Sequence, residues 1–156
     1  MEALLAALEH TGVAQALRVS RWGYAAVNAA HILGVALLVG AIVPLHLRFL
    51  GAWRGVSRAA LVRVLVPVAA AGLALAATAG ALLFAVRARE YADIGFLQAK
   101  LVLVALATLS AILLHRAHGF RLESARDARL AGHAAIGLAC WIGALVCGRL
   151  IAFAGD

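Results

Sequence analysis

The residues best suited to chemistry in this chain are titratable side chains that lie inside long apolar segments. They are His31, His46, His115, His133, Lys100 and Arg149. Ionisable side chains are costly in hydrocarbon and usually mark a functional site there. The same segments contain no aspartate or glutamate. This absence argues against a proton transporter built on a buried carboxylate, a carboxylate-bound metal and a Ser/His/Asp triad.

The spacing of these residues predicts two polar layers at different depths. His31 and His46 are fifteen residues apart, and Lys100 and His115 repeat that spacing. In a helix this interval is about 22 Å of rise and a net rotation of about 60°, so each pair shares a broad face. We expect an inner layer of His46, His115 and His133, with His118 just outside it, and an outer layer of His31, Lys100 and Arg149, with Asn28 and Gln98 nearby.

Each of these side chains also has a purely structural interpretation. A histidine close to the membrane interface can be merely polar, which applies to the inner layer. His31 lies deeper and can hydrogen-bond a neighbouring helix. Lys100 and Arg149 can extend their charged ends toward the lipid headgroups.

Four apolar segments must position the two layers. Hydrophobic residues make up 65% of the chain and charged residues only 13%, against about 25% charged in soluble proteins. A domain of this size buries only about two-thirds of its chain surface, so the remaining apolar surface must face lipid. The segments are 22–47, 61–86, 95–114 and 130–154. Each is long enough to span a bilayer and must be a helix, because lipid offers no partner to the backbone.

The short connections between these segments predict an all-α fold. We expect an integral membrane, up-down-up-down four-helix bundle that forms one domain over 21–156. Residues 1–20 are expected to form a short amphipathic helix at the interface, because leucines recur among polar residues there. Glu2 and Glu9 exclude a signal peptide, which would begin with positive charge. Ser20 is placed to cap the helix that follows.

The arginines predict the orientation. The chain has a net charge of +7, but its arginines flank apolar segments, so we interpret them as topology signals and not as a nucleic-acid site. Eight lie in or beside the first and third connections, against four on the other side. Cytoplasmic loops are rich in arginine and lysine. We therefore expect both termini to face outward, the two arginine-rich connections to face inward, and the lipid bilayer to be the main partner.

Small residues predict where helices touch. Gly72, Ala76 and Gly80 form a small-residue ridge on the second segment, and Gly34 and Gly137 offer further close approaches. Cys140 and Cys147 are two helical turns apart, about 10 Å, which is too far for a disulfide. We interpret both cysteines and Trp141 as packing residues.

Several motifs resemble those of an uncharacterised family of bacterial four-helix membrane proteins. They are His31-Ile-Leu-Gly34, Leu47-Arg48-Phe49-Leu50-Gly51, Phe96-Leu-Gln-Ala-Lys100-Leu101, His115, Trp141 and Gly148-Arg149-Leu-Ile-Ala-Phe153. The resemblance covers 18–153. It departs from the family at His46, where the family pattern has an aspartate. The family carries no activity that could be transferred.

The chain is also loosely similar to small membrane b-type cytochromes and to the membrane domain of copper-resistance proteins. This likeness implies haem b held by inward-facing histidines. Haem iron takes two neutral imidazoles from facing helices, and His46 with His115 forms the best pair, with His133 as a substitute. His31 could hold a haem on one side, with Lys100 and Arg149 at its propionates. A quinone or another small anion could occupy the same place.

Three functions follow from these residues. The first is a b-type cytochrome that passes electrons between quinol and an acceptor. The second is a cofactor-free accessory subunit of a larger respiratory membrane complex. The third is a small metal- or anion-binding membrane protein that uses His46, His115 and His133. Copper handling usually recruits methionine, and Met1 is the only methionine.

Overall fold

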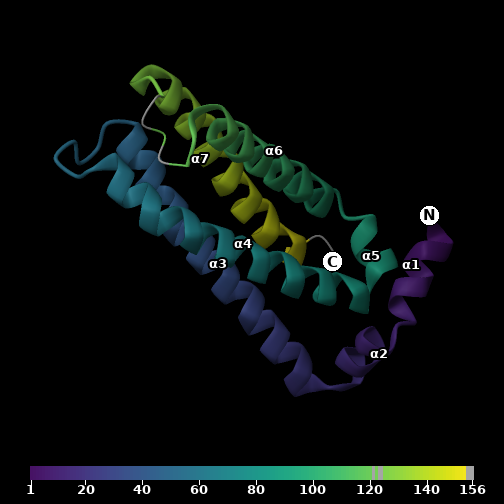
Figure 1. The fold of residues 1–156 in the computed structure, drawn as a ribbon. Coiled ribbons are helices and arrows are strands. Elements are labelled where there is room, and N and C mark those ends of the chain that lie inside the picture. The colour runs from purple at the N-terminus through teal and green to yellow at the C-terminus, as the bar shows by residue number, and fades with distance from the viewer. Residues whose placement is uncertain (121, 123–124, 154–156) are drawn as a thin grey trace.

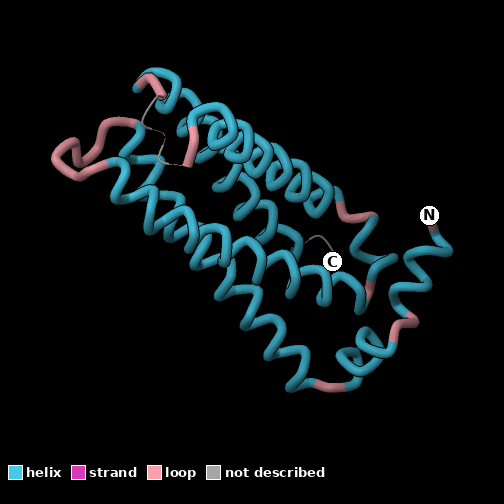
Figure 2. Tube along the Cα trace, in the orientation of Figure 1, coloured by secondary structure: helices cyan, strands magenta, loops and turns pink. Residues whose placement is uncertain are grey.

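The protein is a bundle of long helices with a short helical hairpin at one end (Figure 1). The computed structural model describes residues 1–120, 122 and 125–153. The described residues form helices and loops without a strand (Figure 2). The elements are α1 (Glu2–Glu9), α2 (Gly12–Val19), α3 (Arg21–Phe49), α4 (Arg58–Val86), α5 (Ala88–Ala92), α6 (Gly95–His118), α7 (Asp127–Leu150) and the 3₁₀ turn η1 (Ile151–Phe153).

Four of these helices are long and apolar enough to cross a membrane, which confirms the predicted fold class. They are α3, α4, α6 and α7, the last continued by η1, with mean hydropathies of 2.0 to 2.2. At most 22% of the residues in each apolar stretch are buried inside the protein. Apolar side chains therefore face outward along all four helices, as they do in a multi-pass membrane protein.

Local capping sets where the first two long helices begin. The Ser20 Oγ accepts a hydrogen bond from Gly23 N at 3.0 Å, which confirms the predicted cap. The Ser57 Oγ accepts one from Ala60 N at 3.4 Å, so α4 begins three residues before the predicted segment. A capping serine satisfies a backbone N–H that the first helical turn leaves unpaired.

The N-terminal segment forms two short helices where one was predicted. α1 ends at Glu9, and Thr11 caps the start of α2: its Oγ1 accepts a hydrogen bond from Ala14 N at 3.4 Å. A threonine cap followed by Gly12 favours a break in the helix at this point. The resulting hairpin lies beside α5 at the end of the bundle that carries both termini (Figure 1). The last residue of the fourth predicted segment, 154, lies outside the described residues.

The closest helix pairs are α3 with α4, α6 with α7, and α3 with α7. Glycines bring α3 and α4 into backbone contact. A Cβ on Gly34 would lie 2.5 Å from Ala76 N, and a Cβ on Gly72 would lie 2.6 Å from Leu38 N. The small-residue contact predicted between the first two spans is therefore present.

Apolar side chains fill the inner and middle levels of the bundle. The inner cluster lies at the end of the bundle with the arginine-rich connections and contains Leu45, Val62, Leu114, Leu122, Ala125 and Leu130. The middle cluster contains Leu38, Ile42, Ala107 and Trp141. Trp141 is 6% exposed, which confirms its interpretation as a packing residue. Closer to the termini, the inward-facing side chains include His31 and Lys100.

Candidate functional site: the histidines and cations of the bundle

His46 is held by its own helix and lies against α7. Its Nδ1 is 2.8 Å from the Ile42 carbonyl oxygen. Because a carbonyl oxygen only accepts hydrogen bonds, Nδ1 carries the proton and Nε2 keeps a lone pair in the neutral ring. A Cβ on Gly137 would lie 2.5 Å from this Nε2. Gly137 therefore makes room for the imidazole.

His31, in the outer layer, makes a similar hydrogen bond, but to a neighbouring helix. Its Nδ1 is 2.8 Å from the Ala76 carbonyl oxygen of α4, so Nδ1 again donates. A Cβ on Gly80 would lie 3.0 Å from the ring. Metal-ligating histidines almost always donate their second ring nitrogen in this way, which fixes the tautomer. Both α3 histidines thus present Nε2 as an acceptor or ligand atom.

The two inner histidines outside α3 have different surroundings. His115 stacks on Phe120, with ring centroids 5.9 Å apart. Its Nδ1 is buried and has no hydrogen-bond partner among the described residues. His133 Nδ1 lies 2.9 Å from the Ser110 hydroxyl, which joins α7 to α6. A buried polar nitrogen without a partner is uncommon and calls for an explanation.

The inner histidines do not form one metal site. Leu45 and Leu114, the residues before His46 and His115, belong to the same inner cluster. His46 lies against Gly137 of α7, whereas His133 lies against Ser110 of α6, five residues before His115. Within the part of the chain that the structure describes, no three His, Cys, Asp or Glu side chains gather closely enough to hold a metal ion. His118, predicted just outside the layer, accepts from Arg129 at 3.2 Å.

In the outer layer, Lys100 points between helices and Arg149 does not. A Cβ on Gly148 of α7 would lie 3.3 Å from Lys100 Nζ, so the lysine points between the helices. Arg149 is exposed, and its guanidinium lies 4.8 Å from the centre of the Phe153 ring.

The two remaining residues of the predicted outer layer face elsewhere. Asn28 is exposed. Gln98 is also exposed, and its side-chain amide donates to the Ala92 carbonyl oxygen at 2.9 Å. The structure therefore turns two of the outer-layer side chains between helices: His31 lies against α4 and Lys100 lies against α7.

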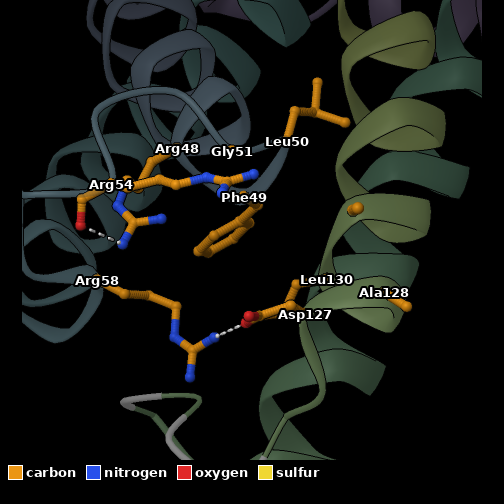
Figure 3. Close-up of a pocket in the computed structure, with 10 residues that line it drawn as sticks. Arg48, Phe49, Leu50, Gly51, Arg54, Arg58, Asp127, Ala128 and Leu130 are labelled. Atoms are coloured by element: carbon orange, nitrogen blue, oxygen red, sulfur yellow. Dashed lines mark hydrogen bonds and ion pairs between the residues drawn. The ribbon is translucent and has the colours of Figure 1, made fainter.

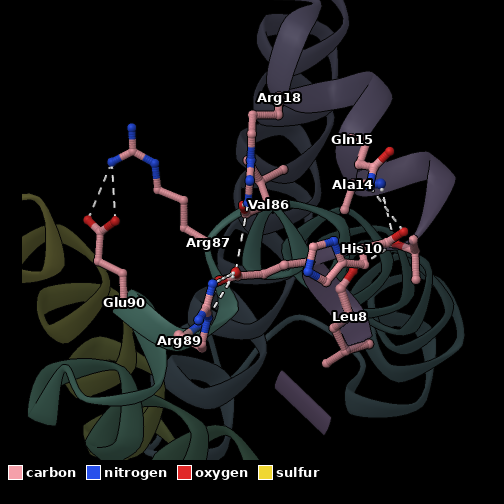
Figure 4. Close-up of polar contacts among 11 residues, drawn as sticks. Leu8, His10, Ala14, Gln15, Arg18, Val86, Arg87, Arg89 and Glu90 are labelled. Carbon is pink, nitrogen blue, oxygen red and sulfur yellow. Dashed lines mark hydrogen bonds and ion pairs between the residues drawn. The ribbon is translucent and has the colours of Figure 1, made fainter. Parts of the chain in front are cut away.

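The sequence patterns missed an ion-pair clasp between the N-terminal hairpin and α5. The buried Glu9 carboxylate accepts from Arg89 N at 3.0 Å and from the Arg89 guanidinium at 2.9 and 3.1 Å. Arg18 lies 4.0 Å from the same carboxylate and donates to the Val86 carbonyl oxygen (Figure 4). The Arg89 backbone N–H, followed by its guanidinium, lowers the pKa of Glu9.

Comparison with protein-family models, with curated proteins and with solved structures finds no match to this chain. The family suggested by the sequence motifs therefore remains a prediction, and the geometry of the side chains has to support any function.

Proposed function

We propose that the protein is an integral membrane electron carrier similar to small b-type cytochromes. It would lie in the bacterial inner membrane with both termini in the periplasm, and hold haem b between its helices. The observation that carries this proposal is the hydrogen bond from His46 Nδ1 to Ile42 O, which leaves the lone pair of the neutral ring on Nε2, the atom that would bind iron.

Two histidines supply the kind of donor that a haem iron takes. His46 offers Nε2 from α3, and His115 offers a ring from α6 whose buried Nδ1 has no partner in the described chain. His133 is engaged by Ser110, so it suits the role of ligand less well. When bound, haem would supply one-electron redox chemistry in an apolar surrounding. Because the His46 ring already lies on Gly137, binding would have to separate that ring from α7.

The outer layer supports a quinone as the redox partner. A quinol hydroxyl can donate to the lone pair on His31 Nε2, and a quinone carbonyl can accept from Lys100. No aspartate or glutamate lies in the four apolar segments to neutralise Lys100. An inward lysine without a carboxylate favours an electron-rich ligand at this level, whether quinone or haem propionate.

Visible absorption of the purified protein tests the proposal. Protein from haem-replete cells should show a Soret band that sharpens and shifts on reduction with dithionite. His46→Ala and His115→Ala should each lower the haem content severalfold. His10→Ala is the matched control, because His10 is exposed at the end of α1. A colourless wild-type protein would contradict the proposal, and full haem content in both variants would assign other ligands.

A cofactor-free accessory subunit of a larger respiratory membrane complex is the second candidate. It is favoured by the middle cluster, in which the buried Trp141 packs against Leu38, Ile42 and Ala107 in the space that a cofactor would need. The expected result for this function is a colourless protein that copurifies with a stoichiometric membrane partner in mild detergent.

A further inference from the structure

A hollow lies at the end of the bundle opposite the termini, and arginines line it (Figure 3). Its volume is about 700 Å³. The end of α3, the loop that leads to α4, and the first turns of α7 form its walls. It is separate from the histidines and from Lys100, so the electron-carrier proposal does not use it.

Among the described residues that line the hollow, the charges are unbalanced. Arg48, Arg54 and Arg58 face a single carboxylate there, Asp127. The Arg58 guanidinium donates to Asp127 at 2.9 Å. The Asp127 side chain is 97% exposed, so it fixes Arg58 from the outer edge of the hollow. Two positive charges therefore remain uncompensated by the residues that line the site.

Arg48 holds the loop that carries Arg54. Its Nε donates to Val56 O at 2.9 Å, and its terminal nitrogen donates to Arg54 O at 3.3 Å. Gly51 allows the turn, because its φ of 105° is in the region that other residues avoid. The Arg54 guanidinium lies over Gly51, and among the described residues no hydrogen bond or ion pair holds it.

The hollow also has an apolar wall. Figure 3 shows the Phe49 ring among the three guanidinium groups. Leu50, which is 45% exposed, and Leu130 continue this wall. Guanidinium groups match the geometry of phosphate oxygens, to which they donate two parallel hydrogen bonds. An apolar wall beside them suits the glycerol and acyl portions of a lipid.

We propose that this hollow binds a phosphate group, with Arg54 as the uncommitted donor and Arg48 and Arg58 as donors fixed in place. The apolar wall favours the headgroup of an anionic phospholipid over free phosphate. The positive-inside orientation places this site at the cytoplasmic leaflet, where it would anchor the ends of α3, α4 and α7 to the lipid surface.

Thermal unfolding of the full-length protein in detergent tests the site. Titration with phosphatidylglycerol should raise the melting temperature, and neutral phosphatidylcholine should not. Arg54→Ala should weaken the apparent affinity for phosphatidylglycerol about tenfold, the effect of losing one charge-assisted hydrogen bond. Arg63→Ala is the matched control, because this exposed arginine lies at the same end of the bundle but does not line the hollow.

Inorganic phosphate in a second titration distinguishes the source of the phosphate. A stabilisation by inorganic phosphate that Arg54→Ala abolishes would support the site and assign it to the free anion. Equal responses of Arg54→Ala and Arg63→Ala to phosphatidylglycerol would overturn the proposal, as would a wild-type protein that responds to neither ligand. Arg54→Gln provides a second variant, and circular dichroism checks that both retain the helical fold.

Discussion

Hydrogen bonds to main-chain oxygens fix the tautomers of two histidines and the position of one arginine in this protein. The Ile42 and Ala76 carbonyl oxygens fix the tautomers of His46 and His31, so each ring presents Nε2. Arg48 uses the same kind of acceptor to fold the loop between α3 and α4. At the end of the bundle that carries the N-terminal hairpin, the Glu9 carboxylate instead accepts a hydrogen bond from the main-chain N–H of Arg89.

We expect Glu9 to make the docking of the N-terminal hairpin depend on pH. Its pKa is lowered from the ordinary value of 4.5, first by the Arg89 backbone N–H and then by the Arg89 guanidinium. The ionised form therefore stabilises the clasp above pH 4.5, and this stabilisation is lost as the pH falls through the lowered pKa. Limited proteolysis of residues 1–20 should accelerate across that range in the wild-type protein.

Glu9→Gln should remove this pH dependence and leave the hairpin easily cleaved at neutral pH, because the amide cannot pair with Arg89 as an anion. Glu2→Gln is the matched control, since Glu2 is exposed on the same helix. If Glu9→Gln retains the cleavage profile of the wild type, the clasp does not hold the hairpin.

The bundle has two kinds of helix interface. In one the backbones touch directly, and in the other a side chain lies between the helices. At the α3–α4 contact, Gly34 and Gly72 let the backbones touch. The α3–α7 contact instead takes a side chain, because the His46 ring fits against Gly137. In lipid, close backbone packing supplies association energy that the hydrophobic effect cannot supply between helices.

Gly34→Val should destabilise the bundle by about 1–3 kcal/mol, the usual result of forcing extra volume into a packed interface. A Cβ at this position would lie 2.5 to 2.9 Å from backbone atoms of α4, which cannot move aside as a flexible side chain can. Gly40→Val is the matched control on the same helix, because a Cβ there meets nothing within 4 Å. Thermal melts in one detergent should show a large loss for the first variant and little for the second.

For the whole molecule, the sequence predicts features that depend on local composition. The four spans follow from hydropathy, and the Ser20 cap follows from one residue beside a helix. The Glu9–Arg89 clasp joins residues eighty positions apart, so no local pattern indicates it. Lys100 and Arg149 had the same expected depth, but helix rotation turns Lys100 toward α7 and leaves Arg149 beside Phe153. Such rotation depends on tertiary packing.

The orientation of the whole molecule in the membrane remains a prediction that fusions can decide. Both connections rich in arginine, α3–α4 and α6–α7, lie at the end opposite the termini (Figure 1). The eight arginines in or beside them, against four on the other side, predict that this end faces the cytoplasm.

Reporter fusions test this orientation. Green fluorescent protein fused after Ser57 or after Gly119 should fluoresce, because these positions are expected in the cytoplasm. Alkaline phosphatase fused after Asp156 should be active, because that enzyme works only once exported. The two loop fusions serve as controls for each other, since the bundle places both at one end. Fusions after Ser57 and Asp156 that report the same side would contradict the four-span topology, whereas the reverse assignment would keep the bundle and move the arginine-lined hollow to the periplasmic leaflet.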